Sequence, residues 1–355
     1  MDYSQYALSP KKLKRYEELK KEYLDLYDDP KNAIPKFLMP TKSSFTPVWE
    51  DRLADKDVML KYHLEKHVPH IEIEDDAVLF ARVDFGTCVV ASAFGCDTFY
   101  PKNNLPCAKT HVVERREDIY NLKVPSLNEP IYEKVKNWTQ YFLEKLPQGY
   151  NITMADVQGP FNNAHLVRGT GIFYDMYDDI DAFYHLMDVV TKATIEYAKA
   201  QRKWAKMEDD MQYDYTALWR GNGRISNCSL HMIGKDLYEK HVLKYDEEFL
   251  KEMKGGRIHY CGTAPGVIER MSMLKDNYGI DYDSNLHDIE SIINSVDERV
   301  PLLQRTHIES KVIQKILKSK TWPFKKRNLI FSIAGDLSID QAKDLYSKLR
   351  RVAEN

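Results

Sequence analysis

The sequence predicts an α/β protein that folds as a (β/α)8 TIM barrel with an N-terminal helical extension. Strand-like and helix-like segments alternate over about 200 residues, which is typical of parallel βαβ units. A doubly wound open sheet produces the same alternation, but its usual G-x-G-x-x-G motif is missing from the first unit, and so is a P-loop. Single barrels of more than about 250 residues are common. We therefore prefer the barrel and keep the open sheet as the alternative.

The first part of the chain differs from the rest. We expect residues 1–45 to form the helical extension and residues 46–355 to form the barrel. The segment Lys11–Tyr27 alternates lysine and glutamate around a few leucines, which predicts a surface helix with a narrow apolar stripe. Prolines at positions 30, 35 and 40 predict an irregular connector after this helix.

The remaining elements follow from local patterns of apolar residues. Residues 75–94 are rich in small and β-branched residues, which predicts a buried strand, and a proline-bearing loop over 101–130 follows. From residue 150 the pattern is regular, with short apolar runs before segments of helical periodicity. The predicted strands are 151–157, 213–219, 257–261, 280–283, 300–304 and 328–333. The predicted helices are 132–145, a long helix capped by Asp178, 236–253, a helix through Met271, 288–296 and 339–352.

The composition excludes several classes of protein. With 43% hydrophobic residues, the chain has enough apolar material for a large core and is not disordered. The 51 basic residues are balanced by 54 acidic ones, which argues against nucleic acid as a partner. No apolar run is long enough for a membrane span, and the five scattered cysteines do not form a disulfide framework. We expect a reduced, cytoplasmic protein.

Polar residues follow several predicted strands, where a barrel has its active site. We expect Asp156 and Glu309 to be catalytic. The residues that we expect to bind substrate are Gln158, Trp219, Arg220, Asn222, Tyr260 and Asp283.

The pair His259 and Cys261 is the strongest candidate metal site. Residues two apart on a strand point to the same side, about 6–7 Å apart, so an imidazole nitrogen and a sulfur can bind one zinc ion. Gly262 then leaves room for a substrate or the metal. A buried cysteine beside a hydrogen-bonded histidine is the alternative interpretation of the same spacing.

Three other features carry less weight. His63 and His67 can share a helix face, but neighbouring charges indicate a solvated surface rather than a metal site. The basic segment Lys315–Arg327 is interpreted as a solvated loop. Cys228 is interpreted as a structural cysteine, and a place in the lining of the pocket is the alternative.

Three stretches of sequence together resemble the uroporphyrinogen decarboxylase superfamily. They are ADVQGPFNNAHLVRGTGIFYDMYDDIDAFYHLMDVVTKATIEYAKAQ, SLHMIGKDLYEKHVLKYDEEFL and GGRIHYCG, and IFSIAGDLSIDQAKDLYSKL falls where the family has its last strand and helix. The resemblance covers about residues 75–355 in order. It implies a (β/α)8 barrel with its active site at the carboxyl-terminal face, frequently in a homodimer.

The superfamily contains two chemistries. The decarboxylases act on uroporphyrinogen without a cofactor and use an arginine-rich segment near the amino terminus, whereas TPVWEDRLADKDVML offers a single arginine, Arg52. The cobalamin-dependent methyltransferases bind zinc through His-x-Cys and a cysteine near the last strand. His259 and Cys261 match that pair, but FSIAGDLS contains no cysteine. The resemblance therefore implies a carboxylate as third ligand (Glu309, Asp283 or Asp336) or a degenerate site.

We expect a zinc-dependent methyltransferase that transfers a methyl group from a corrinoid, carried by a separate corrinoid protein, to a small-molecule thiol. Uroporphyrinogen decarboxylation in tetrapyrrole biosynthesis is the first alternative. A non-catalytic barrel that binds a corrinoid or a tetrapyrrole is the second. We expect neither a membrane nor a nucleic acid as partner, and a homodimer is a further expectation.

Overall fold

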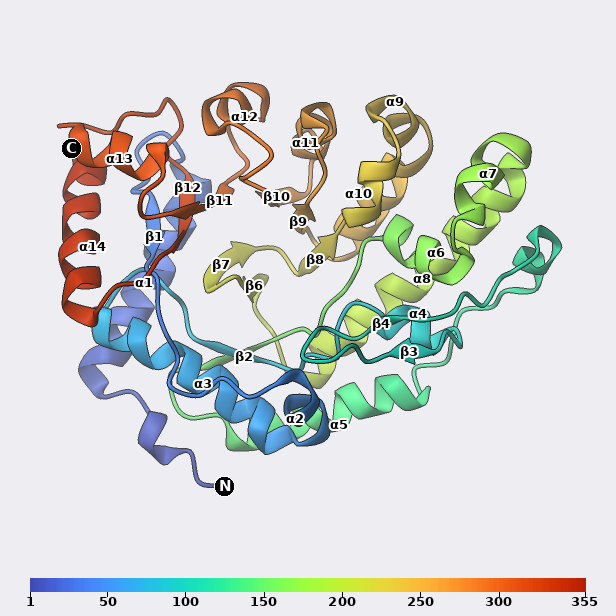
Figure 1. The fold of residues 1–355 in the computed structure, drawn as a ribbon, viewed down its shortest axis with the longest axis horizontal. Helices are drawn as coiled ribbons and strands as arrows, with labels where there is room; N and C mark the ends of the chain where they lie inside the picture. Colours follow the sequence, from blue (N-terminus) through green and yellow to red (C-terminus); the bar gives the residue numbers. More distant parts are fainter.

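A computed structural model describes all residues from 1 to 355 and contains eight parallel strands arranged as a barrel (Figure 1). Six of these strands form one continuous hydrogen-bonded sheet in the order β1-β12-β11-β10-β9-β8, and β2 pairs with β5. The fold class predicted from the sequence is confirmed. In chain order the strands are β1 (Lys36–Leu38), β2 (Phe80–Arg82), β5 (Asn151–Thr153), β8 (Gly223–Ser226), β9 (Gly256–Tyr260), β10 (Asn277–Tyr282), β11 (Leu302–His307) and β12 (Leu329–Ala334).

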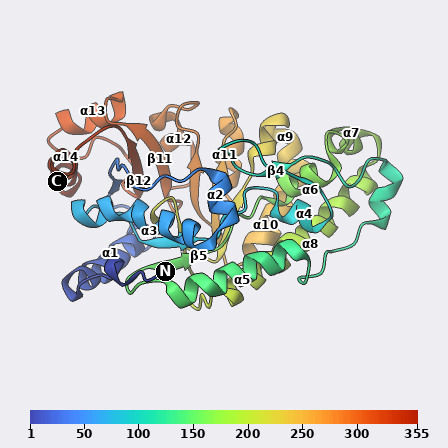
Figure 2. The same cartoon turned by 60° about the horizontal axis from the view of Figure 1, so that its bottom comes forward.

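Helices surround the barrel and connect its strands. α5 and α8 pack side by side on one flank (Figure 2). The helices are α1 (Pro10–Asp28), α2 (Trp49–Ala54), α3 (Lys56–Ile73), α4 (Val89–Ala93), α5 (Pro130–Lys145), α6 (Pro160–Arg168), α7 (Gly171–Asp178), α8 (Ile180–Trp204), α9 (Lys235–Leu237), α10 (Leu243–Glu252), α11 (Pro265–Ser272), α12 (Ile289–Ser295), α13 (Lys311–Lys318) and α14 (Ile339–Glu354). Shorter elements are η1 (Ser4–Tyr6), η2 (Arg116–Asn121), η3 (Cys228–Met232), the π-helical turn η4 (Tyr238–Val242), and the two-residue strands β3 (Thr98–Phe99) and β4 (Cys107–Ala108).

Most of the predicted helices are confirmed. The amphipathic pattern of 11–27 corresponds to α1, which begins after Ser9 because the Ser9 hydroxyl accepts a hydrogen bond from the amide of Lys12. The predicted helix 236–253 corresponds to α9, η4 and α10, which follow one another without a break. The periodicity of buried residues was sufficient to place these helices because each one buries a single face.

The N-terminal segment is more than an extension. Residues 36–38, which fall in the predicted extension, form β1 and pair in parallel with β12. α1 packs with its buried residues Leu19, Tyr23 and Leu26 in a separate core of 14 buried residues that includes side chains from β12 and from the barrel interior. A three-residue strand next to three prolines has too short an apolar run to be found by alternation.

The predicted strand 213–219 is wrong. Residues Met211–Asp214 (β6) and Ala217–Arg220 (β7) form an antiparallel hairpin that lies inside the ring of barrel strands and contacts β5, β9 and β10 (Figure 1). The fourth barrel strand is β8, which starts after this hairpin. An apolar hairpin buried inside a barrel has the same composition as a barrel strand, so the local pattern could not separate them.

The predicted strand over 75–94 contains two elements, because only β2 is extended and Val89–Ala93 form α4. Next to it, two buried aspartates join β1 to β2. Asp76 accepts a hydrogen bond from the amide of Phe37 at 2.8 Å, and Asp75 accepts one from the amide of Met39 at 2.7 Å. The hydroxyl of Tyr346 on α14 also donates to Asp76, at 2.8 Å. These side chains satisfy strand amides at a point where the ladder itself is interrupted.

We expect Asp76→Ala to lower the free energy of unfolding by about 3 kcal/mol, because a buried amide, a tyrosine hydroxyl and nearby arginines would lose their acceptor. Urea denaturation followed by circular dichroism measures this change. Asp344→Ala is the control, since Asp344 is an exposed residue of the same helix as Tyr346 and pairs only with Lys348; we expect its effect to stay within about 0.5 kcal/mol. Equal effects of the two substitutions would contradict this role of Asp76.

Candidate metal centre

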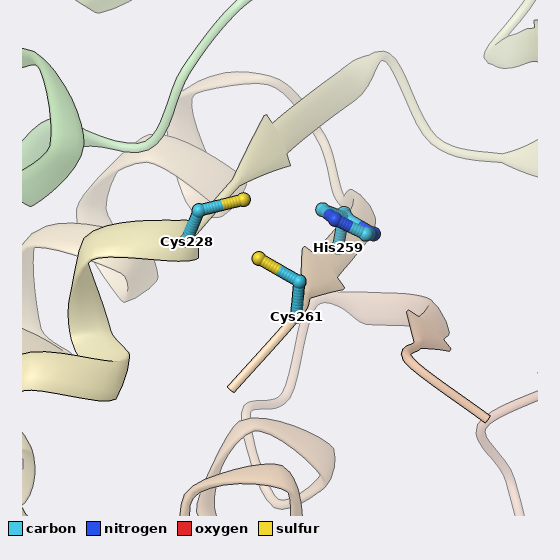
Figure 3. Close-up of side chains that lie close together, drawn as sticks. All are labelled: Cys228, His259 and Cys261. Atoms are coloured by element: carbon cyan, nitrogen blue, oxygen red, sulfur yellow. The ribbon is translucent and has the colours of Figure 1, made fainter. Parts of the chain in front are cut away.

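Three side chains with metal-binding atoms converge at the carboxyl end of β8 and β9. The sulfur atoms of Cys228 and Cys261 and a ring nitrogen of His259 all lie within 4.8 Å of one another. Figure 3 shows the two sulfur atoms pointing toward the same space beside the imidazole ring. The predicted pair of metal ligands is therefore in place on one side of the strand, and a third sulfur completes the group.

The pairing of β8 with β9 brings Cys228 to this group. Ser226 is the register partner of His259, and the amide of Asn227 donates a hydrogen bond to the carbonyl of His259 at 2.8 Å. The chain then turns into η3, whose first residue is Cys228. Because neighbouring parallel strands end at the same rim, Cys228, two residues after Ser226, faces Cys261, two residues after His259.

His259 is oriented by a buried carboxylate on the next strand. Nδ1 of His259 lies 2.7 Å from Oδ1 of Asp281, its register partner on β10, and the second oxygen of Asp281 accepts a hydrogen bond from Arg257 at 2.6 Å. A carboxylate only accepts hydrogen bonds, so Nδ1 carries a proton, and Nε2 is the nitrogen that would bind a metal ion once it has no proton. Hydrogen bonds of this kind orient most metal-binding histidines.

The charges around this group favour ionised ligands. His259 and Arg257 outweigh the effect of burial and hold the pKa of Asp281 well below its usual range. Burial opposes a charge on His259, but the neighbouring Asp281 carboxylate outweighs it and raises the pKa of the imidazole. A hydrogen bond from the Cys228 thiol, together with the nearby His259, lowers the pKa of Cys261 to about 5. The same hydrogen bond and burial raise the pKa of Cys228.

The donor set fits a zinc ion. Zinc–sulfur bonds of about 2.3 Å and zinc–nitrogen bonds of about 2.0 Å in a tetrahedron require donors somewhat less than 4 Å apart, and these three lie within 4.8 Å of one another, so a small shift of the side chains would bring them to one ion. One thiolate, one further cysteine and one neutral imidazole nitrogen are ligands that zinc prefers. Three protein ligands leave the fourth position of the tetrahedron for a substrate atom.

Tyr260 does not face this group. It lies between His259 and Cys261 on β9, so its side chain points to the opposite side, where it is fully buried. Its hydroxyl accepts a hydrogen bond from the amide of Ala264, and a Cβ atom at position 262 would lie 2.2 Å from the hydroxyl oxygen. Gly262 therefore makes room for Tyr260 and not for a ligand, which corrects the interpretation made from the sequence.

Asp156 and Gln158 lie in the barrel interior, beyond the end of β5. Gln158 donates a hydrogen bond to Asp156 at 2.6 Å, and Asp156 forms ion pairs with Arg224 and, at 3.5 Å, with Arg82. Asn162 donates to Gln158 and accepts from the amide of Ser229, the residue after Cys228. These contacts connect Asp156 and Gln158 to the loop that carries Cys228.

Trp219, Arg220 and Asn222 lie at the other end of the barrel. They precede the amino end of β8, whereas the metal ligands follow the carboxyl ends. Trp219 is fully buried and donates a hydrogen bond to the carbonyl of Asp214, Arg220 pairs with Asp28 of α1 at 2.6 Å, and Asn222 donates to Asp210. The expectation that they line the active-site rim is not met, because the segment before them is the internal hairpin.

The three carboxylates considered as a third ligand do not join the metal group. Glu309 is 85% exposed and lies 3.9 Å from His307. Asp336 pairs with Lys42, and Asp283 accepts a hydrogen bond from the amide of Asn285. The residue that the sequence pattern did not identify is Cys228. A strand assignment to 223–226 would have placed Cys228 just past a strand end and would have identified it.

His63 and His67 were expected on a solvated surface, and the structure corrects this. Both are buried in α3, and Nε2 of His67 lies 2.8 Å from the carbonyl of Phe80 on β2. They are separate from the metal group.

Comparisons with known proteins identify the family. The model of the family described as uroporphyrinogen decarboxylase (URO-D) matches residues 75–321, which is more than half of the chain. The chain belongs to the uroporphyrinogen decarboxylase family. The resemblance inferred from the sequence is thereby confirmed.

Curated relatives of this family member are methyltransferases. The methylcobamide:CoM methyltransferase MtbA of Methanosarcina acetivorans is 26% identical over 261 residues, which cover 71% of this chain and 70% of that protein. The corresponding protein of Methanosarcina mazei is 25% identical over the same shares. The solved structure of a methyltransferase from Methanosarcina mazei superimposes with a TM-score of 0.69 at 16% identity, over 93% of this chain and 98% of that one, so it shares the fold.

The chain is thus a family member whose curated relatives are enzymes that transfer methyl groups. No helix in the structure combines the length and the apolar character that crossing a membrane requires.

In the metal-free protein we expect iodoacetamide to alkylate Cys261 several-fold faster than the other cysteines at about pH 6.5. The thiolate is the reactive form, and it is dominant above the Cys261 pKa of about 5, whereas burial raises the pKa of Cys96 to about 11. Peptide mass spectrometry measures both rates. Alkylation of Cys261 that begins only above about pH 8, where an ordinary thiol ionises, would contradict the proposed electrostatics. Added zinc should protect Cys261 and leave the half-buried Cys107 unchanged.

Proposed function

We propose that this protein is a zinc-dependent methyltransferase that moves a methyl group from a corrinoid to the sulfur of a small thiol. The observation that carries the proposal is the convergence of Cys228, His259 and Cys261 within 4.8 Å. The activity named for the relatives, methyl transfer from methylcobamide to CoM, supports the same reaction.

The chain's own residues would prepare the acceptor. Cys228, His259 and Cys261 would hold the ion, and Asp281 would keep His259 in the tautomer whose Nε2 is free. Bound zinc would stabilise the acceptor thiol as a thiolate. The reaction forms a carbon–sulfur bond on the acceptor and breaks the carbon–cobalt bond of the donor, whose electron pair stays with cobalt, while the thiol proton passes to solvent.

Asp156 and Gln158 would act as positioning residues in this proposal. They connect, through Asn162, to the loop that carries Cys228. Glu309 and Asp283 are not assigned a role, because their carboxylates lie outside the cluster. The corrinoid would be carried by a separate corrinoid protein, and a homodimer remains an expectation.

The alternative of tetrapyrrole decarboxylation has less support. The two cavities at this end of the barrel that share Lys66 and Tyr215 measure about 310 and 200 Å3, at or below the lower end for a single drug-sized ligand. Uroporphyrinogen carries eight carboxylates and is larger. The non-catalytic alternative rested on the absence of a third cysteine, and Cys228 removes that reason.

We expect about one zinc per chain in protein purified without chelators. Cys228→Ser should lower zinc affinity at least about 100-fold, because losing even a hydrogen-bond partner of a ligand costs roughly 10- to 100-fold. Competition with a chromophoric chelator measures the affinity, and Cys107→Ser is the control, since Cys107 lies in β4 outside the cluster. Unchanged zinc affinity in Cys228→Ser would rule out the proposed ligand set.

With zinc bound, we expect methyl transfer from methylcobalamin to CoM, detected by the absorbance change of the corrinoid and by mass spectrometry of the methylated thiol. Cys261→Ser should abolish it and Cys107→Ser should retain it. Production of coproporphyrinogen from uroporphyrinogen, with no methyl transfer, would favour the decarboxylase instead.

A further inference from the structure

A further cavity lies at the opposite end of the barrel from the metal group. It measures about 350 Å3 and is formed by three segments that each precede a strand: the residues after α1, before β1; the end of α12, before β11; and the loop before β12. These strands are neighbours in the order β1-β12-β11 (Figure 1), so the three segments meet at the amino-terminal rim. A cavity of this volume can hold one small ligand.

The charges that line this cavity are mostly positive. Four of the lining side chains are cationic: Lys31, Lys325, Lys326 and Arg327. One carboxylate, that of Glu298, also lines the cavity, and it lies 4.0 Å from the ammonium nitrogen of Lys325. The other cations of the lining have no carboxylate within 4 Å.

The carboxylates just outside the cavity do not restore the balance. Asp297 forms an ion pair with Arg299 at 2.8 Å. Asp29 lies two residues before Lys31 in the chain and lines a different cavity. Even if Asp29 offsets the charge of Lys31, no carboxylate is left for the two successive cations of the loop before β12, so an excess of positive charge remains there.

Lys326 has its charge in a buried position without an ionic partner. The residue is only 7% exposed, and its ammonium group donates hydrogen bonds to the carbonyls of Asp297 at 3.2 Å and Glu298 at 2.8 Å. Its third proton has no acceptor in the protein. Burial outweighs the attraction of the two neighbouring carboxylates and lowers the pKa of Lys326 to about 8, so the side chain is still charged at neutral pH. A buried charge is costly unless it is paired, and a bound anion would remove that cost.

Arg327 is oriented by carbonyl groups that do not neutralise its charge. Its Nε donates a hydrogen bond to the carbonyl of Ala33 at 3.1 Å, and its Nη2 donates to the carbonyl of Ala353. Burial lowers the pKa of Arg327, and no carboxylate counteracts this effect. A fixed guanidinium group whose charge has no partner is well suited to bind an oxyanion.

A buried amide oxygen in the same lining needs a hydrogen-bond donor. Asn328 is only 1% exposed, and its Nδ2 donates a hydrogen bond to the carbonyl of Glu298 at 3.1 Å, whereas its Oδ1 has no partner. Exchanging the two amide atoms would turn the oxygen toward that carbonyl, so the hydrogen bond fixes the orientation. Buried acceptors normally have a partner, so the free oxygen at a cavity indicates a ligand that supplies a donor such as a hydroxyl group.

The basic segment Lys315–Arg327 contributes most of this lining, although the sequence indicated a solvated loop. Lys325 agrees with that interpretation, since its side chain is 74% exposed, but buried Lys326 corrects it. The reason is Trp322, whose indole donates a hydrogen bond to the carbonyl of Lys326 at 2.8 Å and packs edge-on against Phe331 of β12. The loop is therefore anchored on the barrel and does not lie free in solvent.

We propose that this cavity binds a small phosphate ester that carries a hydroxyl group, such as a sugar phosphate. The phosphate contacts Lys326 and Arg327, because a group with two negative charges and several acceptor oxygens matches two neighbouring cations better than a single carboxylate does. Lys31 and Lys325 add positive charge from the exposed side, and the hydroxyl group donates to Oδ1 of Asn328. The site is at the opposite rim from the metal group, so this inference does not depend on the proposed function.

Calorimetry on the full chain with ribose 5-phosphate, inorganic phosphate and ribose tests the site. We expect ribose 5-phosphate to bind, inorganic phosphate to bind more weakly, and ribose not to bind, because the charge supplies most of the affinity. Lys326→Gln should weaken the binding of ribose 5-phosphate at least about tenfold, since it removes a charge-assisted hydrogen-bond donor. Lys320→Gln is the matched control: Lys320 is an exposed lysine of the same segment outside the lining, and its substitution should leave the affinity unchanged.

A second variant keeps the test valid if Lys326→Gln does not fold. Lys31 and Lys325 are both exposed, so the double variant Lys31→Gln/Lys325→Gln should fold normally, and we expect it to bind ribose 5-phosphate several-fold more weakly. Unchanged affinity in every variant that folds, or no binding of ribose 5-phosphate by the wild type at millimolar concentrations, would overturn the inference.

Asn328→Ala tests the hydroxyl contact separately. We expect it to weaken the binding of ribose 5-phosphate several-fold and to leave the binding of inorganic phosphate unchanged, because only the ester has a hydroxyl group to donate. Retained phosphate binding also shows that the variant is folded. Wild-type protein that binds inorganic phosphate as tightly as ribose 5-phosphate would show a site for simple anions and would overturn the assignment to a phosphate ester.

Discussion

The buried carboxylate of Asp281 is the constraint on which the candidate site depends. It lies in the middle of the barrel and shares its two oxygens between His259 and Arg257. A charge with no access to water is tolerated only when it is paired, so the neighbours of Asp281 are paired in turn. Arg257 also contacts Asp214, which extends the ion pairs to Arg224. The metal group thus rests on a buried ionic network where many barrels have layers of aliphatic side chains.

The internal hairpin makes this network possible. β6 and β7 fill the barrel with apolar side chains and carry Asp214 into its centre. The turn residues Tyr215 and Thr216 both have positive φ values, of 49° and 57°, which are costly for residues with a Cβ atom and more so for a β-branched one. Backbone strain of this kind persists where the surroundings enforce it and is concentrated at functional sites. Here it places the Tyr215 ring beside the metal group, with its centre 6.3 Å from that of His259.

Family membership alone does not decide between removal of carboxyl groups and transfer of methyl groups. The decision depends on what is presented at the carboxyl-terminal rim. Here the rim offers two sulfurs and an imidazole in one cluster, and two cavities at the same end measure about 310 and 200 Å3. That arrangement suits a small thiol better than a large polyanion, because a ligand with eight carboxylates needs cations distributed around a wide bowl.

The sequence by itself determined the alternation of strands and helices, the family and the His259–Cys261 pair, because each depends on local spacing or periodicity. Only the tertiary structure decided that Cys228 joins them, since its place depends on the register between β8 and β9. Tertiary structure also decided that residues 211–220 form a hairpin inside the barrel rather than a strand of its wall, which moved Trp219 to the opposite end. Burial makes the strands of the hairpin and the strands of the barrel wall equally apolar. The sequence pattern therefore shows that a segment is buried but not which neighbours bury it.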